Sequence, residues 1–451
     1  MGGLSRRATL IEEGRKSHSI AVVDGGDLFG KTPTVSPALI QQSREKARLM
    51  MGAMSLVGLD AWVPGESDWA LGREFVLELV QKHEIPLLAG NLKCGEEWFP
   101  GHRVVERDGR RLGFIGVVES GPDGCELGDP VKAATDAAAA IGDVDVLVGI
   151  FHGDAELDGR VLDVLPQIDF FFNGHTGRSQ ANPRQVKSSW FMGTGQRGKS
   201  IGRLALEWTG QEGPWVSVGE QATIEARMER YKTRVETTQA SLKKAKEEKE
   251  IAKLERRILH HQAQADKLAE EIQNMQQSAE SGHRFRHSLV DLSRSLDNHP
   301  ATEAMVLATK TRIESMALGE QKANPVSSTL PFVGSAVCEA CHPSQTVQWK
   351  TTAHAHAWET LVADKRSMDA DCFSCHVTGA HHPEGPKLPT EVFGLTDVGC
   401  EACHGPGEAH IGQPVGTMTA LDAEERCVDC HDGVQDEGRF DAAVYLPKVQ
   451  H

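Results

Sequence analysis

The chain has 451 residues and a formal net charge of −16, with 48 Lys and Arg against 64 Asp and Glu. This length predicts two or three domains. The negative charge argues against a nucleic acid as a partner, because phosphate backbones attract basic surfaces. The sequence contains no apolar run of about 18 residues, so we expect no transmembrane segment.

Residues 1–222 alternate between apolar strand candidates and amphipathic helix candidates. This alternation is typical of a layered α/β domain, in which functional residues follow the strand ends. The strand candidates are 20–28, 61–64, 86–92, 112–119, 144–151, 170–174 and 190–193. The helix candidates are 37–57, 69–83, 130–141 and 157–165.

Polar side chains gather just after several of these strands. Asp27 closes the first strand and Glu66 follows the second, while His152 and His175 follow two later strands. Carboxylates and two imidazoles at successive strand ends are the ligands that a divalent metal ion needs. The alternative is that these residues only cap loops.

The strand-end segments GDLFG, GESDWALG, AGNL, VLVGIFHG and FFNGHTG resemble the calcineurin-like metallophosphatases, most closely the 5′-nucleotidase branch. The resemblance covers nearly the whole of residues 1–222. It implies that Asp27 occupies the position of the Asp that bridges two metal ions. It also implies that His152 and His175 bind one of those ions.

The sequence departs from the family pattern at three positions. Glu66 stands where the family has a metal-binding Asn, Ser67 where it has a catalytic His, and Gly177 where it has a second His. Two-metal phosphoryl transfer needs both ions and an acid near the leaving group. We therefore expect a degenerate phosphatase site that holds one iron, manganese or zinc ion. The expected metal ligands are Asp27, Glu66, His152 and His175.

The sequence begins with Met1 and then GGLSRRATLI, without an apolar signal region. In the UshA-like proteins that this segment resembles, a strand precedes it. We therefore expect the N-terminal part of the α/β domain, together with a signal peptide, to be missing from this sequence.

Residues 223–320 are predicted to be a helical connector. A heptad seam runs through Ile251, Leu254, Ile258, His261, Ala265, Leu268, Ile272 and Met275. An earlier seam between Met228 and Leu242 is out of phase with it, which indicates either one long helix with a stutter or a hairpin. The coiled coil would form a homodimer or act as a spacer, or the helix packs on the α/β domain with a solvated face. A second helix is expected at 301–318, and 322–331 is expected to be a linker.

Residues 321–451 contain four copies of C-x-x-C-H, which is the attachment pattern of c-type haem. The cysteines are Cys338, Cys341, Cys372, Cys375, Cys400, Cys403, Cys427 and Cys430. The expected proximal iron ligands are His342, His376, His404 and His431. Two zinc sites are the alternative, but they leave the four histidines unexplained. Four covalent haems in so short a segment predict a small, mostly helical and irregular tetrahaem domain whose core is largely porphyrin.

Each iron also has a sixth coordination position. The distal candidates are His354, His356, His382 and His410, and we favour His354 and His410. Two His ligands would give a lower reduction potential than Met and His. Any one of these histidines could instead be a surface residue. An iron without a distal ligand would be a substrate site.

Segments 335–361 and 399–410 resemble the cytochrome c554 family, in which TxHA and GPGxxH motifs supply haem ligands. This resemblance covers residues 330–435. It implies an electron-transfer module located in the periplasm or outside the cell, with a protein redox donor and acceptor. Cys94 and Cys125, the two remaining cysteines, either pair in an oxidising compartment or stay free and buried.

Three functions follow from these patterns. The first is electron transfer by a tetrahaem cytochrome that carries a degenerate metallophosphatase-like domain able to bind a small anion. The second is a metal-dependent phosphoesterase of the 5′-nucleotidase type, with nucleotides as substrates. The third is a multihaem oxidoreductase that acts on a small nitrogen or sulfur compound at an open iron.

Overall fold

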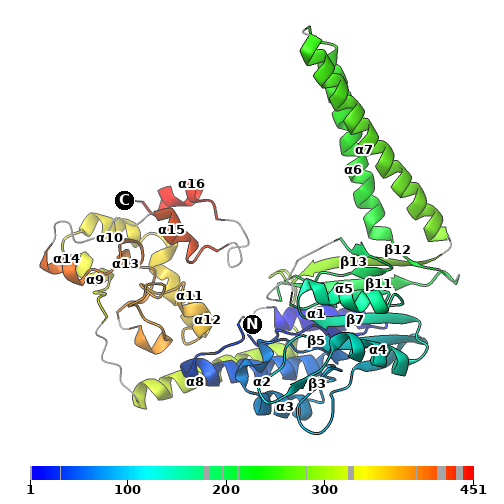
Figure 1. Ribbon diagram of the computed structural model, residues 1–451. Helices are drawn as coiled ribbons and strands as arrows, with labels where there is room; N and C mark the ends of the chain where they lie inside the picture. The colour runs from blue at the N-terminus through cyan, green and yellow to red at the C-terminus, as the bar shows by residue number, and fades with distance from the viewer. Residues whose placement is uncertain are drawn as a thin grey trace. The chain divides into compact units, whose positions relative to one another are not determined.

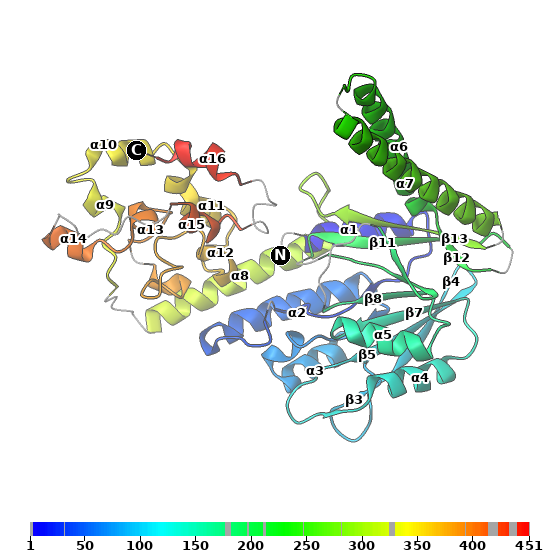
Figure 2. The same ribbon diagram turned by 45° about the horizontal axis from the view of Figure 1, so that its top comes forward.

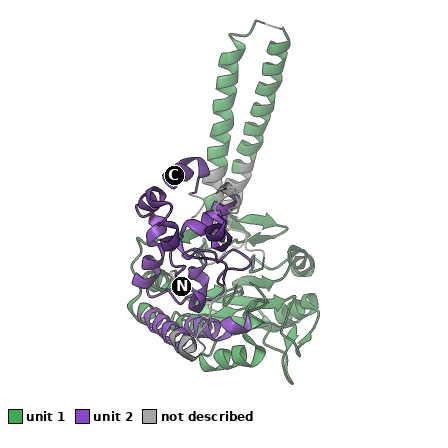
Figure 3. Cartoon of the chain, turned by 90° about the vertical axis from the view of Figure 1, so that its left-hand side faces the viewer, with its two compact units in different colours: residues 1–35, 50–303 green, residues 36–49, 304–451 purple. Residues whose placement is uncertain are grey.

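The computed structural model describes residues 3–30, 32–175, 182–195, 198–210, 213–246, 248–280, 282–323, 330–392, 394–413, 423–432 and 440–450. The chain forms two compact units (Figure 3). The α/β unit comprises residues 1–35 and 50–303, and the C-terminal unit comprises residues 36–49 and 304–451. The three-part division expected from the sequence, with boundaries after residues 222 and 320, stays a prediction. In the part of the chain that the structure describes, no helix is both long and apolar enough to span a bilayer.

A six-stranded sheet forms the centre of the α/β unit, with strand order β4-β5-β7-β8-β10-β9. Strands β5, β7, β8 and β10 run parallel, while β4 and β9 pair antiparallel at the two edges. The strands are β4 (His102–Arg107), β5 (Arg110–Val118), β7 (Val146–His152), β8 (Phe170–Asn173), β9 (Arg184–Val186) and β10 (Ser189–Phe191). Every residue of β7 is buried, as expected of a central parallel strand. The four predicted strands between residues 112 and 193 are confirmed in type.

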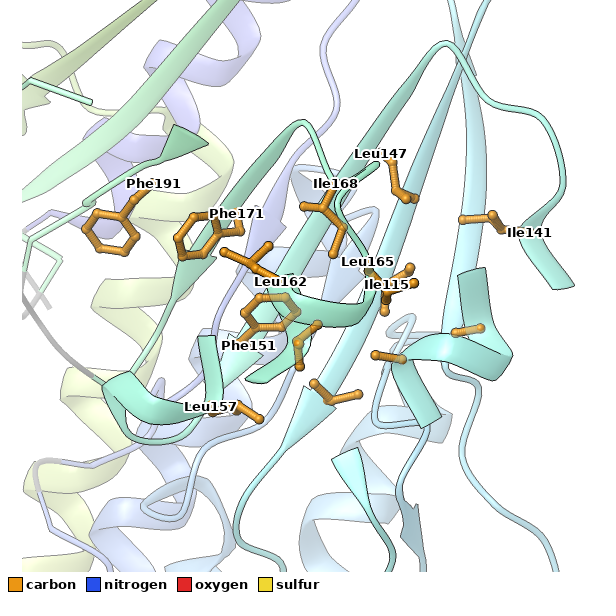
Figure 4. Close-up of a cluster of buried hydrophobic side chains, with 14 residues drawn as sticks. Ile115, Ile141, Leu147, Phe151, Leu157, Leu162, Leu165, Ile168, Phe171 and Phe191 are labelled. Atoms are coloured by element: carbon orange, nitrogen blue, oxygen red, sulfur yellow. The ribbon is translucent and has the colours of Figure 1, made fainter. Parts of the chain in front are cut away.

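Helices α4 (Pro130–Ile141) and α5 (Ala155–Val164) connect the parallel strands and contribute to one buried apolar cluster with them (Figure 4). Phe151 of β7 and Phe171 of β8 lie in this cluster with their ring centroids 6.0 Å apart. Each helix begins at an aspartate whose side chain accepts two backbone N–H groups: Asp129 for α4 and Asp154 for α5. The cap at Asp154 starts α5 directly after the carboxyl end of β7, which leaves that strand end open for functional residues.

The first two strands are much shorter than predicted. β1 (Val23–Asp24) pairs in parallel with β2 (Ala61–Trp62). The predicted strand 86–92 only lies beside β2, with the Leu88 N–H donating to the Trp62 carbonyl. Strand β1 ends early because Gly26 has a φ of 94° and Asp27 a φ of 54°, which turn the chain out of the extended conformation.

Several further elements precede residue 130 in the sequence. They are α1 (Leu4–Arg15), η1 (Pro37–Leu39), α2 (Ile40–Leu56), η2 (Asp68–Leu71), α3 (Arg73–Lys82), β3 (Leu92–Lys93) and β6 (Glu126–Leu127). Strands β3 and β6 pair antiparallel, and directly beside them Cys94 and Cys125 form a disulfide. The pairing of these two cysteines is thus the alternative that the structure confirms.

A second, three-stranded sheet has the order β11-β13-β12 and comprises β11 (Ser200–Glu207), β12 (Trp215–Ser217) and β13 (His283–Asp291). Strand β13 was not predicted, because its sequence HRFRHSLVD is rich in charged and polar residues. Phe285 anchors it: the ring is buried, and its centroid lies 5.0 Å from those of Phe170 and Trp190. The chain therefore leaves this sheet after β12 and returns to it at β13.

Between those two strands the chain forms a helical hairpin of α6 (Val218–Leu242) and α7 (Glu248–Glu280), which lie side by side in both views (Figures 1 and 2). Ile224 of α6 and Leu268 and Ile272 of α7 form a buried cluster, with Met228 and Tyr231 packed against it. The hairpin alternative is confirmed, and one continuous helix is excluded. The seam is buried within one chain, so the homodimer stays a prediction.

The hairpin seam can be tested with Leu268→Ala. Removing this buried side chain should lower the stability of the hairpin by roughly 2–5 kcal/mol and speed tryptic cleavage within residues 218–280. Leu259→Ala on the same helix is the control, because Leu259 is 69% exposed and its loss should change little. If Leu268→Ala instead converts a dimer into a monomer on gel filtration, the seam is shared between two chains.

The C-terminal unit contains residues 36–49, most of α8 (Pro300–Ala323), and then short helices and irregular backbone. Helix α8 corresponds to the helix predicted at 301–318 as part of the connector. The short helices and irregular backbone are as predicted for the haem segment. The short helices are α9 (Ser335–Cys338), α10 (Pro343–Trp349), η3 (Ala353–His356), α11 (Ala357–Ala363), α12 (Ala370–Phe373), η4 (Pro389–Glu391), α13 (Cys400–His404), α14 (Glu408–Gly412), α15 (Ala423–Val428), α16 (Ala442–Tyr445) and η5 (Leu446–Lys448). Most of the predicted linker at 322–331 lies outside the described residues.

Residues 36–49, which include the first part of α2, contact the turn that precedes the second C-x-x-C-H motif. The side-chain amide of Gln42 donates to the Met368 carbonyl at 2.7 Å and accepts the Ala370 N–H at 2.9 Å. Lys46 forms an ion pair with Asp369, whose side chain is 3% exposed. Burial raises the pKa of Asp369, but the Lys46 ammonium and Arg366 outweigh it and lower that pKa to about 2. This turn is therefore fixed by a residue pair far upstream in the sequence.

Candidate functional site: a carboxylate and histidine cluster and four haem motifs

The structure brings the four predicted metal ligands together in the α/β unit. One ligand atom each from Asp27, Glu66, His152 and His175 lies within 4.8 Å of the others. Asp27 and Glu66 stand on the loops after β1 and β2, and His152 and His175 lie at the ends of β7 and β8. Parallel strands place their carboxyl ends at one edge of a sheet, so ligands distant in sequence meet there.

The His152 side chain is 1% exposed, and a backbone carbonyl on the side opposite the cluster fixes the orientation of its ring. Its Nδ1 lies 2.6 Å from the Gly25 carbonyl oxygen, to which it donates. This leaves Nε2 directed at the cluster, 2.9 Å from Glu66 Oε2 and 3.5 Å from Asp27 Oδ2. A carbonyl that fixes the tautomer of a histidine in this way is the usual support of a metal ligand.

Glu66 lies between the two imidazoles. Its Oε1 is 2.9 Å from Nδ1 of His175, while its Oε2 contacts His152. His175 is 46% exposed, so the cluster is open to solvent on its side. Glu66, which stands where the metallophosphatases have a metal-binding Asn, thus supplies a carboxylate that contacts both imidazoles.

Asp27 presents only one carboxylate oxygen to the cluster. Its Oδ1 accepts hydrogen bonds from the backbone N–H of Ser67 at 3.0 Å and from the Ser67 hydroxyl at 2.7 Å. Oδ2 faces His152. Ser67, which stands where the metallophosphatases have a catalytic His, is 3% exposed and donates its hydroxyl to Asp27. Gly177 lies outside the described residues.

A buried carboxylate and a glycine keep the four candidate ligands close together. Asp68 is fully buried and accepts the N–H groups of Asp27, Leu28, Phe29 and Gly65, which ties the two ligand-bearing loops together. Position 65 has no room for a side chain, because a Cβ there would lie 2.3 Å from Asp27 Oδ1.

The charges in the cluster act on each other strongly. Burial lowers the pKa of His152, but hydrogen bonds to Asp27 and the Gly25 carbonyl and the charges of Asp27 and Glu66 raise it to about 9. Burial raises the pKa of Asp27, but hydrogen bonds from His152 and Ser67 hold it below its usual value. Two carboxylates lie beside two imidazoles in this cluster, and their negative charges favour binding of a cation. The donor set of carboxylate oxygens and imidazole nitrogens fits iron, manganese or zinc.

The metal cluster can be tested by metal analysis of the haem-loaded chain. Glu66→Ala and His152→Ala each remove a ligand and should weaken binding of manganese or zinc by at least about 100-fold. Glu126→Ala is the control, because Glu126 is 63% exposed and forms a surface ion pair with Lys93. Equal metal content in all three variants would contradict this site.

In the C-terminal unit the structure brings cysteines of different haem motifs together, and Cys403 of the third motif lies near Cys427 of the fourth. Cys338 of the first motif contacts Cys400 of the third, and Cys375 of the second contacts Cys430 of the fourth. The Cys400 N–H also donates to the Ser335 hydroxyl at 3.1 Å. None of the eight motif cysteines forms a disulfide. All eight thiols are therefore available for thioether bonds to haem.

Two of the four distal candidates face a proximal histidine. The ring centroids of His342 and His410 are 6.2 Å apart, and those of His431 and His354 are also 6.2 Å apart. Two imidazoles that bind one metal ion through bonds of about 2 Å are separated by roughly this distance. Each pair therefore has a centroid separation that matches two imidazoles bound to one iron.

The other two distal candidates lie elsewhere. His356 is 56% exposed and interacts with Glu359 and the Lys350 carbonyl. His382 accepts the Glu384 N–H and packs edge-on against Phe332. Neither contacts a proximal histidine within the described residues, and their haem roles stay predictions.

The remaining proximal histidines are His404 on α13 and His376 after α12. The Nδ1 of His376 lies 2.7 Å from the Ala357 carbonyl oxygen, which directs Nε2 away from that backbone. Among the described residues, no imidazole faces His376 across an iron-sized gap. His381 forms a cluster with Cys375 and Cys430. Because both sulfurs would be thioethers in a haem-loaded chain, this cluster marks haem attachment and is not a separate metal site.

Residues 337–405 match the family described as cytochrome c554 and c-prime. The chain carries a cytochrome c554-type segment. The cytochrome c-554 of Nitrosomonas europaea is 31% identical over 140 residues, which cover 24% of this chain and 60% of that protein. This chain thus spans less than two thirds of that relative. The resemblance to the c554 family that the motifs indicate is confirmed for this segment.

Several solved structures are similar to the chain at low identity. The sulfate thiohydrolase SoxB of Thermus thermophilus has 17% identity and a TM-score of 0.46, and the match covers 74% of this chain and 49% of that one. A putative 5′-nucleotidase of Staphylococcus aureus has 18% identity and a TM-score of 0.39, with 46% of each chain covered. The calcineurin-like phosphoesterase YfkN of Bacillus subtilis has 18% identity and a TM-score of 0.36, with 46% and 77% covered.

The distal ligands of the c554-type segment can be tested by spectroscopy. His410→Ala and His354→Ala each remove one imidazole of a facing pair, so each should convert one of four haems from low spin to high spin. His356→Ala and His382→Ala test the other two distal candidates in the same assay. His18→Ala is the control, because this exposed histidine belongs to the α/β unit and its loss should leave the spin states unchanged. A low-spin spectrum that persists in His410→Ala would exclude this residue as a ligand.

Proposed function

We propose that the chain is a tetrahaem c-type cytochrome that transfers electrons in the cell envelope. The observation that carries this proposal is the two facing histidine pairs, His342 with His410 and His431 with His354, each 6.2 Å apart. Six-coordinate irons bind no substrate, so such haems act as relays. The pairwise contacts between motif cysteines support short distances between neighbouring haems.

The cofactors of this proposal are four covalent haems and one divalent metal ion. The haems would be attached through the eight motif cysteines, with His342, His376, His404 and His431 as proximal ligands. The ion would be iron, manganese or zinc, held by the Asp27 cluster. When bound there, it would polarise an oxygen of a small anion or of a phosphate group.

The metal site is proposed to be mononuclear and poor in phosphatase activity. Asp27 Oδ1 accepts two hydrogen bonds from Ser67, and the four clustered ligands supply one shared set of donors for an ion. The buried Ser67 hydroxyl also provides no general acid. A nucleotide or other small anion is the expected ligand of this site.

Two further observations bear on partners and place. The disulfide between Cys94 and Cys125 favours a periplasmic or extracellular location, and the haem attachment proposed for the C-x-x-C-H motifs agrees with it. Electron transfer requires a protein donor and acceptor, whose identity these features do not specify.

A second candidate function is favoured by the surroundings of His376. The facing pairs assign a distal histidine to the first and fourth motifs, and the haem of the second motif is the one that we propose to have an open coordination position. A small nitrogen or sulfur compound could bind there, which would make the chain an oxidoreductase.

The proposed function is tested with the haem-loaded chain. We expect four haems per chain, reversible reduction of all four, and no metal-dependent hydrolysis of nucleotides or phosphodiesters with iron, manganese or zinc. Asp27→Ala should then leave haem content and reduction unchanged.

Hydrolysis that disappears in Asp27→Ala would instead establish the phosphoesterase. A haem that is high spin in the wild type and changes its spectrum with a small nitrogen or sulfur ligand would favour the oxidoreductase.

A further inference from the structure

The first and third haem motifs are the same pentapeptide, CEACH, but their glutamates have different surroundings. The Glu339 side chain is 47% exposed and forms a surface ion pair with Lys350 at 2.8 Å. Glu401 is 2% exposed. A buried carboxylate is costly unless it is satisfied by hydrogen bonds, so the partners of Glu401 show what its burial achieves.

Glu401 accepts hydrogen bonds from three backbone N–H groups on two separate segments. Oε2 accepts from Gly334 at 2.7 Å and from Val333 at 3.1 Å, while Oε1 accepts from Val333 at 2.9 Å and from Gly407 at 2.7 Å. Both oxygens act only as acceptors in these contacts, which is the arrangement of an ionised carboxylate. A negative charge is thereby fixed inside the unit.

Each of these two segments directly precedes a helix that carries a proposed attachment residue or ligand of the first haem. Gly334 is the residue before α9, which carries Cys338, and Gly407 is the residue before α14, which carries His410. Gly407 packs closely here, because a Cβ on it would lie 3.1 Å from Glu401 Oε1. The Glu401 carboxylate therefore joins the attachment helix of the first haem to the helix that bears the histidine facing His342.

We propose that Glu401 is a positioning residue, which holds His410 opposite His342, and that its buried charge lowers the reduction potential of the haems carried by the first and third motifs. The inference deepens the proposed electron-transfer function and rests on it. A negative charge near a haem stabilises the oxidised iron, and this effect is large where the surroundings exclude water. Cys400 adjoins both Glu401 in sequence and Cys338 in space, so both haems lie near that charge.

The test compares Glu401→Gln and Glu401→Ala with Glu339→Gln and Glu339→Ala in the full, haem-loaded chain. The glutamine removes the charge and keeps one carbonyl acceptor, whereas the alanine removes the charge and every hydrogen bond. The readouts are haem content from the pyridine haemochromogen, spin states from electron paramagnetic resonance, and midpoint potentials from spectroelectrochemical titration.

We expect Glu401→Gln to raise the midpoint potential of one or two of four haems. Glu401→Ala should do the same and should also convert one haem to high spin, because His410 is no longer held. The Glu339 variants should match the wild type in potentials and spin states, since Glu339 lies at the surface.

Four haems with unchanged potentials in Glu401→Gln would overturn the inference and leave the proposed function intact. If Glu401→Ala does not mature, the potentials of Glu401→Gln decide alone. A wild-type chain without four haems would overturn the proposed function itself.

Discussion

A buried carboxylate that accepts backbone N–H groups from separate segments underlies the geometry of both units. In the α/β unit it is Asp68, which receives four N–H groups from the loops that carry Asp27 and Glu66. Burial raises the pKa of Asp68 to about 7, while the donated hydrogen bonds oppose this effect. These bonds also maintain the unusual φ of 54° at Asp27, which a free loop would relax. In the C-terminal unit the corresponding carboxylate is Glu401, which accepts backbone N–H groups from two separate segments.

The two units are stabilised by different kinds of packing. The α/β unit has a continuous apolar core under its parallel sheet, so its ligand cluster rests on rigid strand ends. The C-terminal unit has mostly short helices and few large buried side chains, among them Phe373 and Leu395. A unit of this kind gains much of its packing from the porphyrins it binds. Its polypeptide therefore specifies positions for cofactors more than contacts between its own side chains.

Some of this could be predicted from the sequence because the signals are local. Asp129 followed by Pro130 predicts the start of α4, and the strand-end motifs predict all four members of the carboxylate and histidine cluster. Other features depend on contacts between distant residues. A break in heptad phase does not distinguish a stutter from a hairpin, and β13 becomes a strand only through its partners. The two CEACH motifs make the same point, since identical pentapeptides place Glu339 at the surface and Glu401 inside.

The contacts of Gln42 and Lys46 have a consequence for where this chain can be divided. The turn before the second haem motif is bonded to residues more than 300 positions upstream. A fragment that began at residue 330 would leave Asp369 with Arg366 as its remaining cationic partner. The sequence boundary of the cytochrome c554-type segment is therefore not the boundary of the unit in which it is built, because residues 36–49 belong to that unit as well.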